Sequence, residues 1–97
     1  MTALSLRQED GLYGAPDLVI EVLSPATSQL DKKAKRALYA RTGVKEMWLV
    51  DPILQQIHRY DFARDPVRAV RLIEDDESFA SPLFPGLRVN AAEVFKR

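Results

Sequence analysis

Two apolar runs, separated by a polar segment with helical periodicity, dominate the pattern of this chain. Residues 17–23 (DLVIEVL) and 45–51 (KEMWLVD) are rich in Val, Ile, Leu, Met and Trp. Nearly continuous runs of this length are typical of strands that are covered on both faces. The intervening residues 30–42 repeat their apolar positions every three or four residues, which predicts a helix that ends at Gly43.

The predicted helix carries recognisable end signals and one apolar face. Thr27 or Ser28 is expected to cap its start, and Asp31 would complement the positive end of the helix dipole. The opposite, charged face carries Lys32 and Arg36. The face that we expect to pack on the sheet consists of Leu30, Ala34, Ala37, Leu38 and Arg41.

The rest of the chain predicts short antiparallel strands. Residues 56–62 alternate in the manner of a half-exposed strand, and residues 67–73 are expected to form a further strand. Asn90 is expected to cap a final helix over residues 91–96, after a loop that contains two of the six prolines. Residues 1–13 are short of a core of their own, and either a helical turn or a short edge strand would fit them.

Strand, helix and strand within about 36 residues form a βαβ unit, which favours a parallel strand pair. The expected fold is therefore α/β, a mixed β-sheet in which this unit is followed by an antiparallel meander. A chain of 97 residues has room for one domain of this kind, residues 1–97.

Composition narrows the functional classes. The 14 basic and 14 acidic side chains balance, so no overall electrostatic field draws the chain to nucleic acid or to a membrane. A neutral net charge does not exclude a nuclease, whose contacts with DNA can be local. The absence of cysteine excludes disulfides and thiolate metal sites, and a single histidine makes a zinc site an unfavourable hypothesis. No apolar run approaches the length of a membrane span, and the first residues do not resemble a signal peptide, so we expect a cytoplasmic protein without membrane contact.

An acidic residue inside the first strand is the main chemical clue. An ionised Glu21 in a buried strand costs several kcal/mol unless a cation or a hydrogen-bond donor meets it, and a metal ion would do so. Asp17 shares its face of the strand, but the two residues lie about 13 Å apart in an extended chain. Ligands of one magnesium ion lie only about 2.1 Å from it, so a second carboxylate would have to come from an adjacent strand.

The predicted helix offers a cation for this acid. Asp31, Lys35 and Tyr39 form a stripe beside the apolar face, and Lys35 would reach toward Glu21 if the helix packs near the end of the strand. Lys33 borders the other flank, and periodicity alone does not choose between the two lysines.

Structural roles compete with these functional ones. Glu21 would equally suit a salt bridge to a basic residue of the helix, and Asp17 would suit the first hydrogen bond of the strand. Lys35 lies in a run of charges that would suit a solvated face, and Tyr39 is expected to be a packing residue with a solvated hydroxyl group.

The chain resembles the Uma-type restriction endonuclease family of the PD-(D/E)XK nuclease superfamily. The resemblance rests on GAPDLVIEVLSPATS at residues 14–28, on Asp31, Lys35 and Tyr39, on the segment that ends in WLVDP at residues 48–52, and on SPLFPGLRVNAAEVF at residues 81–95. It implies a restriction-endonuclease-like core and a nuclease that hydrolyses DNA phosphodiester bonds with Mg²⁺ or Mn²⁺.

The same resemblance implies roles for individual residues. Glu21 matches an acid that holds the metal, and Lys35 matches a helical lysine that replaces the one normally found two residues after the acid, where this chain has Leu23. Asp17 matches a recurrent acid of the family. We therefore expect Glu21, Lys35 and Asp17 to be the catalytic residues, with Glu21 as the metal ligand.

The chain resembles only the C-terminal half of the family. Members are about twice as long, and their N-terminal half supplies the other metal carboxylate; Glu9 and Asp10 are weak candidates to replace it. Alternatively, the chain is a truncated, non-catalytic remnant that forms a homodimer or binds a complementing chain through an open sheet edge. A DNA-binding module without hydrolysis is a third possibility, which the neutral net charge supports poorly.

Overall fold

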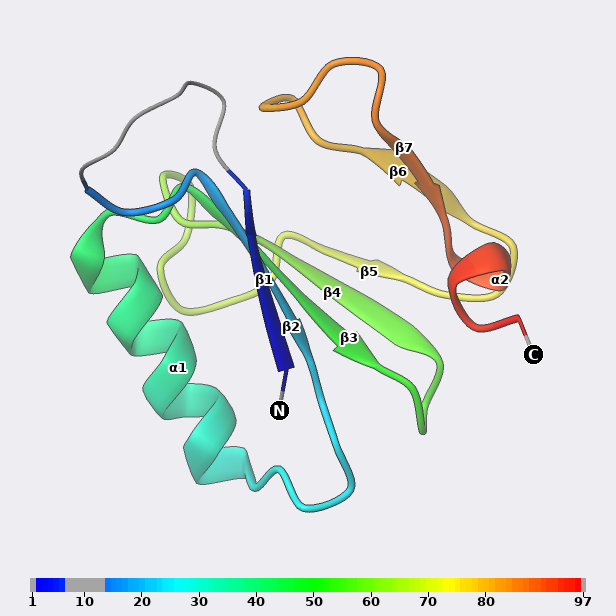
Figure 1. The fold of residues 1–97 in the computed structure, drawn as a ribbon, viewed down its shortest axis with the longest axis horizontal. Helices are drawn as coiled ribbons and strands as arrows, with labels where there is room; N and C mark the ends of the chain where they lie inside the picture. The colour runs from blue at the N-terminus through cyan, green and yellow to red at the C-terminus, as the bar shows by residue number, and fades with distance from the viewer. Residues whose placement is uncertain (1, 7–13, 97) are drawn as a thin grey trace.

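A twisted five-stranded sheet forms the centre of the molecule (Figure 1). The computed structural model describes residues 2–6 and 14–96. The strands lie side by side in chain order, and β2 pairs with β3 in parallel while the other neighbours are antiparallel. They are β1 (Thr2–Leu6), β2 (Leu18–Val22), β3 (Glu46–Asp51), β4 (Gln56–Asp61) and β5 (Arg71–Ile73).

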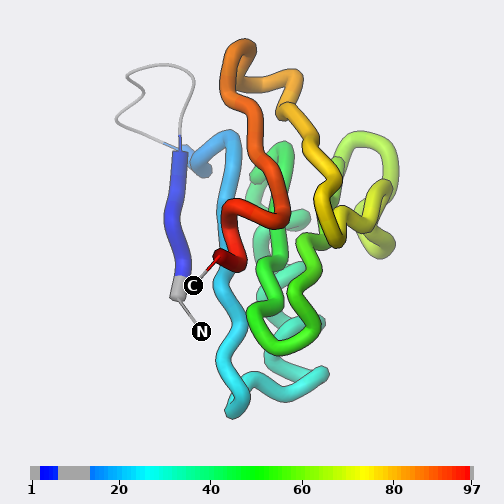
Figure 2. The backbone as a smooth tube through the Cα atoms, turned by 90° about the vertical axis from the view of Figure 1, so that its right-hand side faces the viewer, coloured from blue at the N-terminus to red at the C-terminus, as the bar shows by residue number. Residues whose placement is uncertain are grey.

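Different elements cover the two faces of this sheet. The helix α1 (Gln29–Thr42) connects β2 to β3 and lies on one side. A two-stranded sheet of β6 (Ser78–Ala80) and β7 (Arg88–Asn90) lies on the other side with the short helix α2 (Ala91–Val94), as Figure 2 shows. The molecule therefore has three layers, with the sheet in the middle.

The main hydrophobic core lies between the sheet and the C-terminal layer. Alternate residues of β2 and β3 point into it, as the period of two in a strand requires, and they meet apolar residues of β4, β5, β6 and α2. Trp48 contacts Phe79 edge to face, with ring centroids 4.7 Å apart. The buried members are Leu18, Trp48, Val50, Ile57, Ile73, Phe79 and Ala91.

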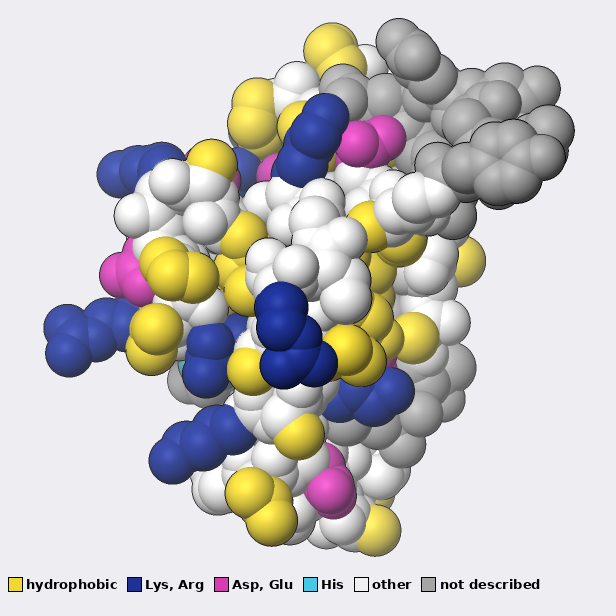
Figure 3. Space-filling model, turned by 90° about the vertical axis from the view of Figure 1, so that its left-hand side faces the viewer, with side chains coloured by type: hydrophobic (Ala, Val, Ile, Leu, Met, Phe, Trp, Pro, Cys, Tyr) yellow, Lys and Arg dark blue, Asp and Glu magenta, His cyan; other side chains and the backbone are white. Residues whose placement is uncertain are grey.

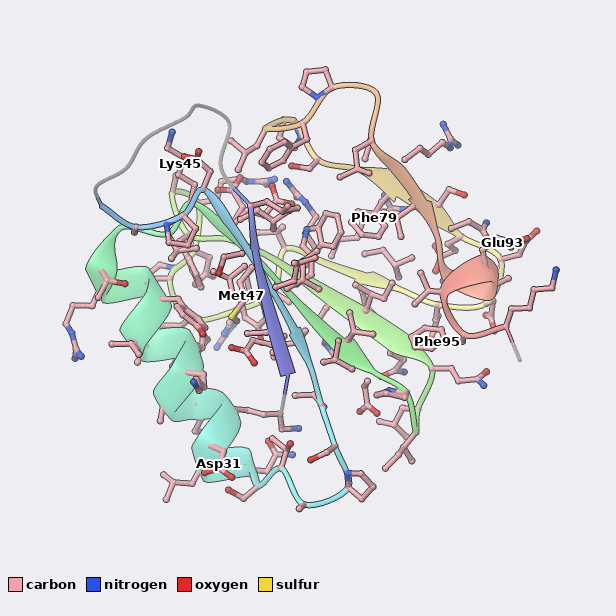
Figure 4. The ribbon with its side chains drawn as sticks, viewed as in Figure 1. Asp31, Lys45, Met47, Phe79, Glu93 and Phe95 are labelled. Atoms are coloured by element: carbon pink, nitrogen blue, oxygen red, sulfur yellow. The ribbon has the colours of Figure 1, made fainter. Side chains whose placement is uncertain are left out.

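A smaller cluster lies on the α1 side of the sheet. Its buried residues are Leu23, Met47 and Leu49, and the half-buried rings of Tyr39, Tyr60 and Phe62 pack against them. Figure 4 shows Met47 between the sheet and α1, and Phe79 on the opposite side of the sheet. The sheet is therefore covered thoroughly on one face and only in part on the other.

The predicted α/β fold, a βαβ unit followed by an antiparallel meander, is confirmed. Of residues 1–13, the structure describes 2–6 as an edge strand, which is one of the two forms that the sequence allowed. The strand predicted over residues 67–73 is wrong in length, because β5 begins only at Arg71. The Asp65 carboxylate accepts hydrogen bonds from the backbone N–H groups of Val67 and Arg68, which forms a turn in place of a strand.

Two further differences concern the C-terminal layer. The strands β6 and β7 were not predicted, since each has three residues and too short a pattern for periodicity to detect. The last helix has the predicted cap, with the Asn90 side chain accepting from the N–H of Glu93, but it ends at Val94 and not at residue 96.

The ends of α1 agree closely with the sequence prediction. Ser28 and Asp31 form a reciprocal capping box, in which each side chain accepts a hydrogen bond from the backbone N–H of the other. These hydrogen bonds lower the pKa of the Asp31 carboxyl group below its usual value. Gly43 ends the helix in the left-handed conformation, with a φ of 98° that a side chain would strain.

The predicted orientation of α1 about its own axis is wrong. No residue of the helix is buried, and two leucines of the supposed packing face, Leu30 and Leu38, are 75% and 40% exposed. The side that faces the sheet carries the half-buried side chains of Lys32, Lys35, Arg36, Tyr39 and Ala40. No helix among residues 2–6 and 14–96 is long and apolar enough to cross a lipid bilayer.

Candidate functional site

Glu21 is buried at the centre of β2, on the face of the sheet that α1 covers. Its side chain is 1% exposed. In the strand register it lies between Ala3 of β1 and Leu49 of β3, and neither can neutralise a charge. The expectation that this acid is buried within the sheet is confirmed.

The Tyr39 side chain of α1 meets this carboxylate. Its hydroxyl group donates a hydrogen bond of 2.6 Å to Glu21 Oε1. Burial and this hydrogen bond raise the pKa of Tyr39 from 10.0 to about 12, so the hydroxyl group stays protonated and remains a donor at neutral pH. The expectation that the hydroxyl group is merely solvated is therefore wrong.

The same contact explains the rotation of the helix. A buried carboxylate without a donor costs more than the exposure of one leucine, which is worth about 1.5–3 kcal/mol. A helix that buried Leu30 and Ala34 would turn Tyr39 away from Glu21. The helix therefore satisfies the acid and leaves its apolar face exposed.

Lys35 lies one turn before Tyr39 on α1. Its Nζ atom is 5.9 Å from the centroid of the Tyr39 ring, within the range of a cation–π contact. It also lines a groove of about 430 Å³ between α1 and the loop after β2, together with Ser24, Thr27 and Asp31. Glu21, Tyr39 and Lys35 thus form a chain of contacts from the buried sheet to an open groove.

Lys35 and Glu21 are nevertheless not an ion pair. Among residues 2–6 and 14–96, the ion pairs join Lys45 to Asp17 and Arg59 to Glu46. Among the described residues, Glu21 therefore does not form the salt bridge with a basic residue of the helix that was considered as an alternative. Asp31 and Lys35 do not form an ion pair either.

Asp17 lies apart from this group. It precedes β2, and its carboxylate pairs with the Lys45 ammonium group at 3.2 Å. Its backbone oxygen accepts hydrogen bonds from the N–H groups of Lys45 and Glu46, which aligns the starts of β2 and β3. The structure thus gives Asp17 a part in holding the parallel pair together and does not bring it to Glu21.

The described residues provide one carboxylate, that of Glu21, as a ligand for a divalent cation. Magnesium is commonly held by one or two carboxylates, with water and substrate phosphates as its other ligands, and Glu21 suits the first of these roles. Within the described part of the chain, no group of three or more His, Asp or Glu side chains converges on one point. Glu9 and Asp10 lie outside the described residues.

Sequence reasoning missed two polar residues that the structure makes prominent. Tyr39 had a usable signal, since it shares the helical stripe with Asp31 and Lys35. The role of Glu46 had little signal, because two of its three donors, Arg59 and Ser81, are distant in the chain and only Trp48 is near. Glu46 is 2% exposed and lies on the opposite face of the sheet, away from α1.

Comparisons with known proteins give the family and a related fold. A solved structure described as a putative nuclease belonging to DUF820, from Anabaena variabilis ATCC 29413, matches with a TM-score of 0.70 and 26% sequence identity. The match covers 92% of this chain and 51% of that one, so the chain spans about half the length of this relative. No curated protein matches the chain. A family model described as "Uma2: Putative restriction endonuclease" matches residues 2–92, and the chain therefore belongs to the Uma2 family.

Proposed function

We propose that this chain carries part of the active site of a metal-dependent endonuclease that hydrolyses phosphodiester bonds in DNA. The family and the solved relative support a nuclease. The observation that carries the proposal is a buried carboxylate, Glu21, that a neutral donor orients and that no cation among the described residues neutralises. Lys35 lies over the ring of Tyr39 and lines an open groove.

Each residue has a chemical role in this proposal. Glu21 holds the metal ion, with Tyr39 fixing the orientation of the carboxylate through Oε1. Lys35 stabilises the negative charge that builds up on the phosphate oxygens in the transition state. Asp17 supports the strand pair on which Glu21 lies and does not touch the reacting groups.

Magnesium, or manganese in its place, would supply the remaining chemistry. When bound, it polarises a phosphate oxygen and lowers the pKa of a bound water molecule. The strand positions opposite Glu21 hold Ala3 and Leu49, so neither paired strand supplies a second carboxylate there. The half of the relative that this chain does not match is the natural source.

Cleavage of supercoiled plasmid in the presence of Mg²⁺ or Mn²⁺ tests the proposal. We expect the wild type to nick the plasmid, with Glu21→Gln at background level because a neutral amide binds the metal far more weakly than a carboxylate does. Lys35→Gln should cut more slowly at unchanged metal affinity, since the lysine acts on the transition state.

Two substitutions serve as matched controls in this assay. Glu93→Gln removes an exposed carboxylate from α2, and Arg41→Gln removes an exposed cation from the outer side of α1. Both should cut at the wild-type rate. Nicking by Glu21→Gln at the wild-type rate would contradict the proposal.

A second candidate function is a non-catalytic domain that associates with another polypeptide. It is favoured by Ala3 opposite Glu21, where a second metal carboxylate would be expected, and by β1 as the edge strand of the described part of the sheet. A dimer in sedimentation, together with no heat of magnesium binding in calorimetry and no nicking, would support this candidate over the nuclease.

A further inference from the structure

A second groove, distinct from the one beside Lys35, separates α1 from β3 and β4. Its volume is about 430 Å³, within the usual range of ligand pockets. On the side of the molecule where α1 lies, Lys and Arg side chains gather among apolar ones (Figure 3). We name it the basic groove after its charged and aromatic lining of Lys32, Lys33, Arg36, His58 and Tyr60.

The positive charges of the basic groove are compensated only in part: outside its lining, backbone hydrogen bonds lower the pKa of the Asp65 carboxyl group, and Arg36 lies close enough for its charge to help lower it. Lys32, Lys33 and Arg36 line it together with a single carboxylate, Asp51. Among the described residues, none of these three cations forms an ion pair with a carboxylate. Arg36 donates one hydrogen bond of 2.6 Å to the backbone oxygen of Pro66, which is neutral.

The one carboxylate of the groove is already engaged. Asp51 Oδ1 accepts hydrogen bonds of 3.0 and 3.1 Å from the backbone N–H groups of Ile53 and Leu54. These bonds hold the turn between β3 and β4. Asp51 therefore shapes the floor of the groove, and the three cations leave a net positive charge there.

The charges act across the groove, from the helix to the sheet. The pKa of His58 on β4 is lowered, first by burial and further by the Lys32 charge, although Asp51 opposes the shift. Burial raises the pKa of Tyr60, and the Arg36 charge opposes that change. Lys32 and Arg36 are thus near enough to the β4 side chains to affect their ionisation.

We propose that the basic groove binds the phosphodiester backbone of DNA. The inference rests on the proposed nuclease function and adds a substrate contact outside the Glu21 site. Lys32 and Arg36 lie one helical turn apart, about 6 Å along the axis, a spacing that suits a strand with repeated phosphate charges. Backbone contacts of this kind position a nucleic acid without reading its sequence.

Fluorescence anisotropy of a labelled 20-base-pair duplex, measured in EDTA from 50 to 300 mM salt, tests this groove. The variants Lys32→Gln and Arg36→Gln should each reduce the slope of log affinity against log salt by about 1. At 0.1 M salt, each should weaken binding roughly five- to tenfold, because one counterion fewer is released.

Arg41→Gln is the matched control, because it removes the same charge from the exposed side of the same helix. It should leave both the affinity and the salt slope at the wild-type values. Circular dichroism melting of every variant confirms that the fold is intact. Equal slopes for the wild type and both groove variants would overturn the proposal, as would a wild type that does not bind the duplex.

The outcome is separable from that of the nuclease proposal. Glu21→Gln should lose cleavage but keep the wild-type affinity and salt slope, because Glu21 does not line the basic groove. Groove-dependent binding without any cleavage would uphold the groove and reject the nuclease. Calorimetric binding of pyrophosphate that both groove variants lose, with no duplex binding by the wild type, would assign the groove to small phosphorylated ligands and overturn the DNA assignment.

Discussion

Two glutamates, Glu21 and Glu46, are buried among the described residues, and their different surroundings distinguish a functional role from a structural one. Glu46 accepts hydrogen bonds from Trp48, Ser81 and both Nε and Nη2 of Arg59, so its charge is balanced in place. Glu21 has one neutral donor, Tyr39, and no cation among the described residues. A bound cation would complete the surroundings of Glu21, whereas Glu46 needs nothing further.

The Tyr39–Glu21 hydrogen bond should contribute measurably to stability. Tyr39→Phe removes the donor and leaves the buried carboxylate without it, and we expect a loss of about 1–3 kcal/mol in the free energy of unfolding. Urea denaturation at pH 7 measures this loss. Tyr60→Phe is the control, since none of the residues that the structure describes forms a hydrogen bond with its hydroxyl group, and its loss of stability should be smaller.

Alkaline pH gives a second readout of the same variant. The pKa of Tyr39 is about 12 in the folded chain against about 10 unfolded, so the unfolded state releases this proton first as pH rises. The wild type should therefore lose stability between pH 10 and about 12 by more than Tyr39→Phe does. Parallel pH profiles for the two proteins would show that the hydroxyl group is not held as described.

At the scale of elements, the orientation of α1 is the least expected feature and can be tested directly. Leu30→Lys should change the free energy of unfolding by less than about 0.5 kcal/mol, because Leu30 is 75% exposed. Met47→Ala, in the cluster on the α1 side of the sheet, should cost about 2–5 kcal/mol. A large loss for Leu30→Lys in urea denaturation would mean that the apolar side of α1 is covered.

The sequence predicted what local signals determine and failed where distant contacts decide. Ser28 and Gly43 mark the ends of α1 through capping and a left-handed turn, which involve only neighbouring residues. The rotation of the helix depends on Tyr39 reaching Glu21, eighteen positions away in the chain, and no periodicity contains that information. The acid itself was predictable, because a charged residue stands out in an apolar strand. The arrangement around it was not.

At the scale of the whole molecule, Glu46 ties the sheet to the C-terminal layer. Its carboxylate joins Arg59 of β4 to Ser81, which follows β6. The layer also rests on apolar packing around Phe79 and Ala91. One ionic cluster and one apolar core therefore hold the same interface.

Glu46→Ala should weaken this interface strongly. It leaves the Arg59 charge buried without a partner, which costs about 3–5 kcal/mol. In hydrogen exchange followed by mass spectrometry, the exchange rate of the Glu46→Ala variant relative to the wild type should increase more in β6 and β7 than in β2 and β3. Glu74→Ala, which removes a partly buried carboxylate that accepts from Gln56, should have a much smaller effect. A uniform increase in exchange rate across both layers would show that Glu46 does not link them.

The parallel pairing of β2 with β3 also constrains which kinds of sequence change this site can survive. Glu21 stands opposite Leu49, and successive residues of the strand point to opposite layers. A single-residue insertion or deletion between Asp17 and Glu21 would shift the register of the strand by one residue. The carboxylate would then point to the C-terminal layer, away from Tyr39. Descendants of this chain can exchange the side chains around the acid, but the spacing within β2 has to be inherited intact.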